Sequence, residues 1–405
     1  MAFQQGLSGL SVAAKTLEVI GNNIANAAVA GFKASSVQFG DIYASSLGQA
    51  GAAAVGIGSL TQKVSQQFVQ GNITNTNNPL DVAIHGNGFF RLSDQGNVTF
   101  TRNGQFHLEN DGTIANASGD KLTGWAETLQ ANQQTPTTIS ILKMDLSEMK
   151  PIATSKLGFG LNLNMAASLP ANSTFSITDP TSYTNSTSAT LYDTRGAEHS
   201  ATLFFAKTAA GYDLRYSVDG VLMAAPNPTA LTFNASGIRT SADKVTVTPP
   251  VVALPLVGPG AFVVDMTSWT GFASKFSVSK IDQDGQSSGR LSNFAISDIG
   301  EVLGHYDNGR TKSMGQIALV NFPSVAGLLS DGANQWKETF ESGKPFLGAP
   351  GNSGFGSLQA SATEDSNVDL TVELVQLITA QRIYQANAQS IKTQDQILQT
   401  LVNLR

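Results

Sequence analysis

The side chains that most often bind metals or transfer protons lie far apart in this sequence. It has four histidines and no cysteine. Helical zinc sites place two histidines four residues apart, and thiolate sites need cysteine, so neither type of site is indicated. Histidines outside such patterns are usually ordinary strand or turn residues. We therefore predict no metal and no catalytic role for the four, which are His85, His107, His199 and His305.

Three further patterns resemble chemical sites only in part. Gly86 to Phe90 is rich in glycine, but a phosphate loop must open a helix, and this segment runs into a strand pattern. Asp282, Asp284 and Gly285 resemble a calcium loop that lacks its final acidic residue. No Gly-x-Ser-x-Gly motif occurs, and no carboxylate pair has a setting typical of glycosidases. The sequence predicts a protein that is not an enzyme and binds no cofactor.

The low charge content of the chain indicates which kinds of molecule it can bind. Only 13% of the 405 residues are charged, against roughly 25% in ordinary soluble domains. Such a low value fits loop-rich β structure, or surfaces that become buried against other molecules. The net charge of -6 provides no positive surface for nucleic acid, so we predict no nucleic-acid partner.

The sequence shows no pattern that would direct it into a membrane. The N-terminus does not combine a positive segment with an apolar one, as a secretory signal peptide does. No run approaches the ~20 apolar residues of a membrane helix, which predicts no membrane insertion. The protein is therefore either cytosolic or exported by a route that reads no cleaved signal peptide.

Both ends of the chain repeat apolar residues every seven positions. Paired rows at alternating spacings of three and four place an apolar stripe along one helix face. Near the N-terminus the rows are Phe3, Leu10, Leu17 and Ile24, and Leu7, Ala14, Gly21 and Ala28. Near the C-terminus they are Leu370, Leu377, Tyr384, Ile391 and Leu398, and Leu374, Gln381, Ala388, Asp395 and Val402. Periodicity alone leaves open two amphipathic helices lying on a globular core.

The remaining faces of these helices carry few charges. A helix that faces solvent normally has many Glu and Lys residues, whereas here the C-terminal segment carries mostly amides and apolar groups. Amides can be buried with hydrogen bonds, while unpaired buried charges are costly. We therefore predict that the two helices pair and that other copies cover them. The residues predicted to pack in this polymer are Phe3, Leu7, Leu10, Leu17, Ile24, Leu370, Leu374, Leu377, Tyr384, Ile391 and Leu398.

The limits of the two helices can also be predicted. Ser366-Asn367-Val368-Asp369 resembles a capping box at the start of the C-terminal helix. The N-terminal helix has a weak point at Gly21-Asn22-Asn23, and we expect it to end near Gly31.

Between the ends, apolar residues alternate with polar ones and turn dipeptides are frequent, which indicates β structure. Asn97 to Thr101, Asn103-Gly104 and Gln105 to Glu109 predict a hairpin with a type I′ turn. Leu291 to Ser297 and Glu301 to Tyr306 predict a second hairpin.

These elements predict an α+β fold in which N- and C-terminal helices pair like a coiled coil around two nested, mainly antiparallel β domains. We expect a helical polymerisation domain with connector at 1–72 plus 360–405, a first β domain at 73–150 plus 285–359, and an inserted outer β domain at 151–284. Segments 34–78 and 323–362, rich in Gly, Ala, Asn and Gln, are predicted to be connectors.

Several motifs resemble those of the bacterial flagellar rod and hook proteins. The N-terminal ones are Gly21 to Asn26, Gly31 to Lys33 and Phe39 to Tyr43, and the central ones are Asp81 to Ile84, Gly88 to Phe90 and Thr101 to Phe106. The C-terminal motifs resemble the hook members in particular, and are Ser366 to Leu370, Ala380 to Arg382, Tyr384 to Asn387 and Leu404-Arg405. The residues predicted to matter as family motif positions are Gly21, Asn22, Asn23, Asn26, Gly31, Phe32 and Lys33.

The resemblance implies a structural subunit of the flagellar hook, a curved tubular polymer that acts as a universal joint and transmits torque from rod to filament. It implies self-association into a helical homopolymer. It further implies contacts with the distal rod, the hook cap, the hook-filament junction proteins and the flagellar type III export apparatus. The implied location is the extracellular hook, reached without a cleaved signal peptide.

Alternative functions remain open at this point. A flagellar rod subunit would share the helices, but rod proteins lack so large an insertion as 151–284. A secreted surface adhesin with helical anchors would be a monomer that binds a ligand. An enzyme acting on cell-wall polymer would need the carboxylate pair that the sequence does not indicate.

Overall fold

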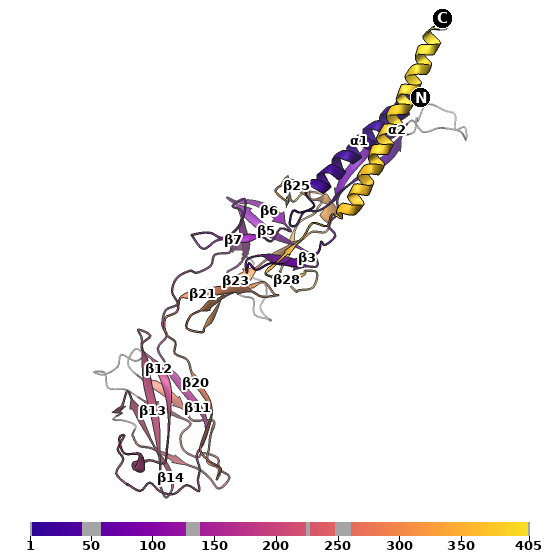
Figure 1. The fold of residues 1–405 in the computed structure, drawn as a ribbon. Helices are drawn as coiled ribbons and strands as arrows, with labels where there is room; N and C mark the ends of the chain where they lie inside the picture. The colour runs from indigo at the N-terminus through magenta and orange to yellow at the C-terminus, as the bar shows by residue number, and fades with distance from the viewer. Residues whose placement is uncertain (1, 43–57, 127–137, 224–226, 248–260, 404–405) are drawn as a thin grey trace. The chain divides into compact units, whose positions relative to one another are not determined.

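The computed structural model describes residues 2–42, 58–126, 138–223, 227–247 and 261–403. The predicted motif residues Tyr43, Leu404 and Arg405 lie outside this description. The chain forms two compact units, drawn in Figure 1. The first comprises Met1–Leu146, Asn293–Gly304 and Thr311–Arg405, and the second comprises Ser147–Ser292 and His305–Arg310. Two terminal helices and many antiparallel sheets confirm the predicted α+β fold.

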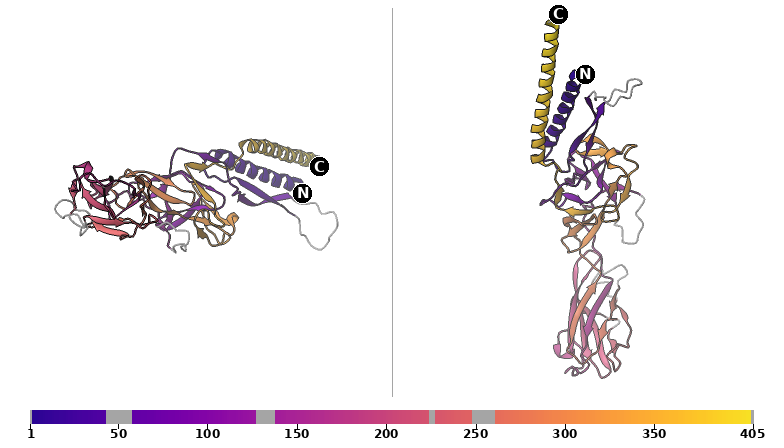
Figure 2. Two further views of the ribbon diagram at one scale, coloured as in Figure 1. Left: turned by 90° about the horizontal axis from the view of Figure 1, so that it is seen from below. Right: turned by 90° about the vertical axis from the view of Figure 1, so that its right-hand side faces the viewer.

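Two long helices contain the ends of the described chain. α1 spans Ala2–Ala25 and α2 spans Leu370–Asn403. They lie side by side in all the views of Figures 1 and 2. They run antiparallel, because Gly6 of α1 lies against Ile391 while Asn23, near the other end of α1, bonds Glu373. This pairing confirms the predicted partnership of the terminal helices.

Side-chain hydrogen bonds hold the C-terminal end of α1 and the N-terminal end of α2, which lie together at the base of the helix pair. α1 ends at Ala25 rather than near Gly31, so the predicted end was wrong. Just before this end, Asn23 bonds both backbone groups of Ser35, which draws the returning chain against the helix. α2 begins after Asp369, whose carboxylate accepts hydrogen bonds from the backbone N–H groups of Thr371 and Val372. Asp369 is thus the N-cap that satisfies the first helical donors.

A two-stranded ribbon follows α1. β1 (Ser35–Ile42) and β2 (Gly58–Gln66) pair antiparallel and both contact α1. The prediction that 34–78 is a plain connector was therefore wrong for these two strands. The many small and amide residues of this segment are typical of loops, but Val37, Phe39 and Val64 supply enough β-branched and aromatic surface for a ribbon.

The main sheet of the first unit is antiparallel and has thirteen strands, with a central path β21-β22-β23-β9-β5-β6-β26-β25. Its core contains Phe89, Phe100, Phe322 and Trp336. The strands are β5 (Phe89–Asp94), β6 (Asn97–Thr101), β7 (Phe106–Leu108), β8 (Ile114–Asn116), β9 (Lys121–Trp125), β10 (Ser140–Ile141), β21 (Leu291–Ile296), β22 (Glu301–Tyr306), β23 (Thr311–Ile317), β24 (Leu319–Asn321), β25 (Leu329–Gly332), β26 (Gln335–Lys337) and β27 (Phe346–Gly348). A short 3-10 helix, η2, spans Val325–Gly327.

One predicted hairpin in this sheet was wrong and the other is confirmed. β6 pairs with β5 and β26, whereas β7 pairs with β8, so Asn103-Gly104 does not join a hairpin. Gly104 instead lies against strand β4 (Val82–His85), where a Cβ would come within 1.7 Å of the Val82 carbonyl oxygen. The second hairpin forms as predicted, since β21 and β22 are neighbours joined by a turn at Ser297 to Glu301.

Within the first unit, two small sheets join the segments that lead into and out of the main sheet. β4 (Val82–His85) pairs with β28 (Ser357–Ala360), and β3 (Ile73–Asn75) pairs with β29 (Ala362–Glu364). Both pairs are antiparallel, and they bring residues that are almost 300 positions apart into register. The C-terminal connector therefore enters α2 alongside the segment that follows β2.

The second unit consists of two five-stranded sheets around one core. Phe205 of one sheet meets Trp269 of the other edge to face, with ring centroids 5.6 Å apart. The first sheet holds β11 (Lys156–Asn162), β17 (Lys244–Val247), β18 (Phe262–Asp265), β19 (Trp269–Thr270) and β20 (Ser277–Gln283). The second holds β12 (Asn185–Tyr192), β13 (Glu198–Lys207), β14 (Gly211–Val218), β15 (Val221–Leu222) and β16 (Thr229–Thr232), and η1 is a 3-10 turn at Pro180–Ser182.

Candidate functional site

The histidines occupy ordinary positions in sheets. His85, His107, His199 and His305 lie on β4, β7, β13 and β22, as the sequence indicated. His199 bonds Asp219 through Nδ1 at 2.7 Å and lies beside Asp193, so it ties two turns of one sheet together. Among the described residues no group of three or more His, Asp and Glu side chains could hold a metal ion.

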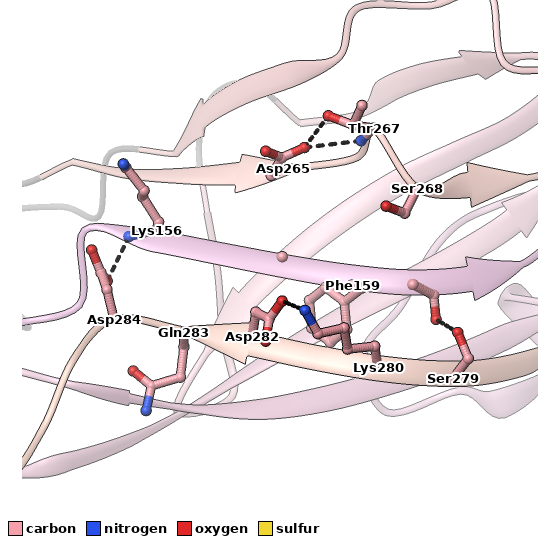
Figure 3. A pocket seen from close by; sticks show the side chains of 12 residues that line it. Lys156, Phe159, Asp265, Thr267, Ser268, Ser279, Lys280, Asp282, Gln283 and Asp284 are labelled. Carbon is pink, nitrogen blue, oxygen red and sulfur yellow. Dashed lines mark hydrogen bonds and ion pairs between the residues drawn. The ribbon is translucent and has the colours of Figure 1, made fainter. Parts of the chain in front are cut away.

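The carboxylates that resembled a calcium loop are engaged within the chain. Figure 3 shows them along a shallow groove of about 670 Å³ on β11 and its neighbours. Asp282 pairs with Lys280 on the same strand. Asp284 accepts hydrogen bonds from the backbone N–H groups of Ser155 and Lys156 at 2.8 Å. These contacts give both carboxylates a structural role in the second unit.

The seam between α1 and α2 is built on small side chains. The most buried row of α1 is Gly6, Ala13 and Ile20, each seven residues from the next. A Cβ on Gly6 would come within 2.9 Å of Ile391, and one on Gly9 would meet the Asn387 amide at the same distance. Such close approach brings the two helix backbones together, as small residues allow in tightly packed helix pairs.

The seam uses only one of the two rows predicted on each helix. Leu10, Leu17 and Ile24 of α1 are half-buried, as are Leu377 and Ile391 of α2. The second row of α1, represented by Leu7, is exposed, because Gly6, Ala13 and Ile20 take its place in the seam. On α2 the row of Glu373, Ala380, Asn387 and Gln394 replaces the predicted row of Leu374. The predicted second row of each helix is therefore displaced by one residue from the row that is buried, and on α1 the buried row contains the small residues Gly6 and Ala13.

Large apolar side chains consequently face outward on both helices. Leu7 is 53% exposed and Leu374 is 46% exposed. The predicted packing residues with more than a third of their surface exposed are Phe3, Leu7, Leu370, Leu374, Tyr384 and Leu398, and further exposed apolar residues of α2 are Val372, Val375, Ile378, Ile383, Ile397 and Val402. Neither helix, over its described length, is apolar enough to cross a membrane. These rows form an extended unpartnered apolar surface.

The base of the helix pair is joined by a hydrogen bond between side chains. Asn23 is 2% exposed and donates from Nδ2 to Glu373 Oε1 at 2.9 Å. Because Asn23 also bonds Ser35, one amide connects α1, α2 and β1. The other motif residues of this turn, Gly21 and Asn22, are exposed, and Asn26 is half-buried.

A buried ion cluster lies where the helices meet the sheets. Lys33 Nζ is 2.6 Å from Glu364 Oε1, and Arg102 Nη1 is 3.1 Å from Glu364 Oε2. The side chains of Lys33 and Glu364 are fully buried. Two cations therefore share one carboxylate, and burial lowers the pKa of the Lys33 ammonium against the opposing pull of Glu364.

Backbone groups complete the cluster. Lys33 donates to the Val69 carbonyl at 2.8 Å, and Arg102 donates to the Gly86 carbonyl at 2.7 Å. Gly71 N–H donates to Glu364 Oε1 at 2.9 Å. The cluster thus joins the segment after α1, the segment after β2, the main sheet and the strand before α2.

Gly31 explains why the motif around Lys33 begins with glycine. Its φ is +70°, and a Cβ there would come within 2.6 Å of the Asn103 backbone nitrogen. Its N–H donates to the Glu364 carbonyl at 2.7 Å. Any larger residue would displace this contact, and the neighbouring Phe32 is buried beside it.

Comparisons with known proteins agree with this architecture from end to end. Four family models match in chain order: flagella basal body rod protein at 3–33, flagellar hook protein FlgE/F/G D1 domain at 83–156, flagellar basal body protein FlaE D2 domain at 162–286, and flagellar basal body rod FlgEFG protein C-terminal at 359–404. The flagellar hook protein FlgE of Salmonella typhimurium is 40% identical, and the alignment covers the whole of both chains. The chain belongs to the flagellar hook protein family.

Other members of the family extend the comparison. FlgE of Escherichia coli is also 40% identical over the full length of both chains, and FlgE of Borreliella burgdorferi is 28% identical over 99% of this chain and 98% of its own. The crystal structure of the Helicobacter pylori flagellar hook protein FlgE2 has a TM-score of 0.53 at 13% identity, covering 72% of this chain and all of its own. Hook proteins are structural, which confirms the prediction that the chain is not an enzyme.

Two residues of the ion cluster were missed by sequence reasoning. Arg102 lay within a family motif but had no predicted partner, and Glu364 had no signal of its own. The sequence analysis also assigned no role to Glu373, which bonds Asn23 in the structure.

Proposed function

We propose that this chain is the subunit of the flagellar hook, a curved tubular polymer that acts as a universal joint and transmits torque from rod to filament. The paired helices α1 and α2 are its polymerisation surface. The observation that carries this proposal is the outward apolar surface of both helices, in a chain that is 40% identical to FlgE hook proteins along its full length.

The chemistry of that surface favours contact with other copies. Covering the exposed apolar rows with another copy is favourable by about 25 cal/mol per Å² of apolar surface buried. Apart from Glu373 the described length of the two helices carries only Lys15, Glu18, Arg382, Lys392 and Asp395 as charged groups, and Lys15 already pairs with Glu18. Little charge therefore needs to be desolvated when helices from several copies pack together.

The finer features of the proposal follow from family membership. The packing residues are those predicted from sequence, with Leu7, Leu374 and Leu398 directed to neighbouring copies. The further partners are the distal rod, the hook cap, the hook-filament junction proteins and the flagellar type III export apparatus. The subunit is exported without a cleaved signal peptide and functions outside the cell.

The domain division proposed from sequence also bears on this function. Residues 1–72 with 360–405 form the polymerisation domain, 73–150 with 285–359 the first β domain, and 151–284 the outer β domain. In this division the helices hold copies together while the β domains adjust as the tube bends.

The substitution Leu7→Asp tests the polymerisation surface. Leu7 is 53% exposed in the single chain, so the variant should keep the circular dichroism spectrum and unfolding transition of the parent protein. Burying an unpaired carboxylate between copies costs several kcal/mol, so electron microscopy should show no tubes at concentrations where the parent protein forms them.

Leu7→Met provides the matched control, because it keeps an apolar side chain of similar volume at the same site. It should form tubes at the parental concentration. Normal tubes from Leu7→Asp would show that this row does not lie between copies.

A further inference from the structure

Phe340 is the most exposed large apolar side chain of the described residues, at 102% of its reference surface. It lies in the first unit, in the loop after β26. Leu329, on the neighbouring strand β25, is 60% exposed. Aromatic side chains held in this way are frequent anchors at protein interfaces.

The loop that carries Phe340 is held in one conformation by its neighbours. Ser342 is fully buried and accepts from Thr339 N–H at 2.9 Å, while its Oγ donates to the Thr339 carbonyl at 2.8 Å. Thr339 Oγ1 donates to the Gly327 carbonyl at 2.6 Å and accepts from the N–H groups of Glu341 and Ser342. Ordering this loop therefore costs little further entropy when a partner binds Phe340.

A groove of about 590 Å³ lies beside this side chain. Its walls include Val64 and Phe68 from the β2 segment and Leu328 and Leu329 from the segment around η2. Lys63 and Glu341 supply its charges, and Lys63 Nζ is already 3.4 Å from the Ala326 carbonyl. Glu341 is exposed, and its carboxylate has no ion-pair partner among the described residues.

One face of α2 has the chemistry that complements this groove. Leu374, Ile378 and Arg382 follow one another at intervals of four, which places them on one side of the helix. Leu374 and Ile378 are 46% and 49% exposed. Arg382 is also exposed and forms no ion pair within the described chain. Two apolar anchors are thus followed by a cation on the same face.

We propose that the groove beside Phe340 in one copy of the chain binds the Leu374, Ile378 and Arg382 face of α2 in a second copy. Leu374 and Ile378 contact Phe340 and the apolar wall, and Arg382 pairs with Glu341 at the rim. This is the binding mode in which an amphipathic helix lies in an apolar groove. It rests on the proposed function, since it names one contact by which copies of the subunit assemble.

The two surfaces are different patches of the same chain. No residue of α2 lines the groove within one copy, and the helix face is exposed there. A contact between unlike patches leaves a new groove and a new helix face available after each addition, so it extends a polymer rather than closing a dimer. This property matches the assembly that the helices support.

Disulfide cross-linking gives a direct test, because the natural chain has no cysteine. The double variant Phe340→Cys with Ile378→Cys is assembled and then oxidised. Covalent multimers of increasing length are expected on a denaturing gel, whereas each single variant should yield no multimers beyond dimers. If the double variant forms normal tubes but remains monomeric on the gel, the groove contact is excluded while polymerisation itself stands. If the parent protein forms no tubes, it is the proposed function that fails.

Charge exchange tests the rim of the groove independently. Glu341→Arg and Arg382→Glu should each raise the concentration needed for assembly about fivefold or more, since each places like charges together. The double exchange should return that concentration to within about twofold of the parent. Asp94→Arg is the control, because it makes the same charge change on an exposed residue that does not line the groove. A double exchange that assembles no better than the single variants would overturn the pairing.

Discussion

Glu364 is the residue at which four distant segments of the chain converge. Its carboxylate accepts from Lys33, Arg102 and the Gly71 backbone, and its carbonyl accepts from Gly31. A fully buried carboxylate is stable only when opposite charge and hydrogen bonds surround it. The glycine and lysine of the N-terminal family motif therefore serve to hold this one acid.

Removing that carboxylate should damage the fold more than removing one of its cations. Glu364→Gln leaves Lys33 and Arg102 buried with no counter-charge, and breaking a buried pair in this way costs about 3–5 kcal/mol. Lys33→Met retains the pair of Arg102 and Glu364 and leaves the Val69 carbonyl without its donor, a loss of about 1–3 kcal/mol. Unfolding by urea, followed by circular dichroism, measures both. Equal losses would contradict the shared-carboxylate description.

Raising the pH should stabilise the parent protein relative to Lys33→Met. Burial lowers the pKa of Lys33 in the folded chain despite the attraction of Glu364, while the unfolded lysine keeps a pKa of about 10.4. At a pH between the pKa of folded Lys33 and that of unfolded Lys33, the unfolded chain binds more protons than the folded chain. The free energy of unfolding therefore rises with pH over this range, and the part of it due to Lys33 is lost as the pH is lowered. Unfolding measured from neutral pH to about pH 10 in both proteins checks the sign. A difference that shrinks with rising pH would refute it.

At the level of single residues, sequence reasoning singled out one of the three charged residues of this cluster, Lys33. Gly31, Phe32 and Lys33 were singled out by family resemblance, without any physical role. Their partner Glu364 is 331 positions from Lys33, and a single sequence contains no signal for a charge pair over such a distance. Periodicity reports neighbours along one helix or strand, whereas this pair joins the segment after α1 to the end of β29, which are brought together only by the tertiary fold.

The helix pair shows why the apolar repeat was only partly informative. Heptad spacing identified both helices and one row of each seam. It could not identify the second row, because Gly6 and Ala13 are weak apolar signals although they control how closely the backbones approach. The size of a side chain predicts how much surface it can bury, but the residues of the seam are those whose shapes let the two helices pack closely.

Two glycines of α1 should respond in opposite ways to the same substitution. Gly6→Leu places a Cβ within 2.9 Å of Ile391, so overpacking should cost about 1–3 kcal/mol and separate the helices. Gly21→Leu meets nothing within 4 Å, so it should gain the better helix propensity of leucine, about 0.5–1 kcal/mol. Thermal melting of the helical signal distinguishes the two. A stabilised Gly6→Leu variant would show that the seam is looser than the structure indicates.

The nested organisation of the whole chain gives a prediction of its own. Within the second unit, Ile152 and Gln286 form an antiparallel bridge, so the chain enters and leaves that unit at adjacent points. Replacing residues 151–284 with a short Gly-Ser linker should therefore leave the first unit folded and able to form tubes, with altered bending. Electron microscopy of the deleted protein measures tube formation and curvature. Complete loss of tubes would place an essential contact in the removed segment.

For the whole molecule, the sequence was most informative about the order of helices and strands along the chain. It was least informative about the structure of the segments between them. Alternating strands with terminal helices gave the fold class, because those patterns follow from which faces must be buried. The composition of 34–78 predicts a connector, yet this segment contains the β1–β2 ribbon, which contacts α1. Strands with polar residues on both faces have no clear period, so their pairing depends on a helix that the strand pattern does not show.

Because the Lys33–Glu364 pair is buried from solvent, its strength should depend little on the salt concentration around the protein. Dissolved salt weakens attraction between charges that are exposed to water, over distances of about 10 Å at 0.1 M. Lys33 and Glu364 have no exposed side-chain surface, so dissolved ions cannot come between them. The joint between the helices and the sheets should therefore keep the same stiffness in dilute and in saline surroundings, while contacts at the surface, such as Arg382 with Glu341, weaken as salt rises.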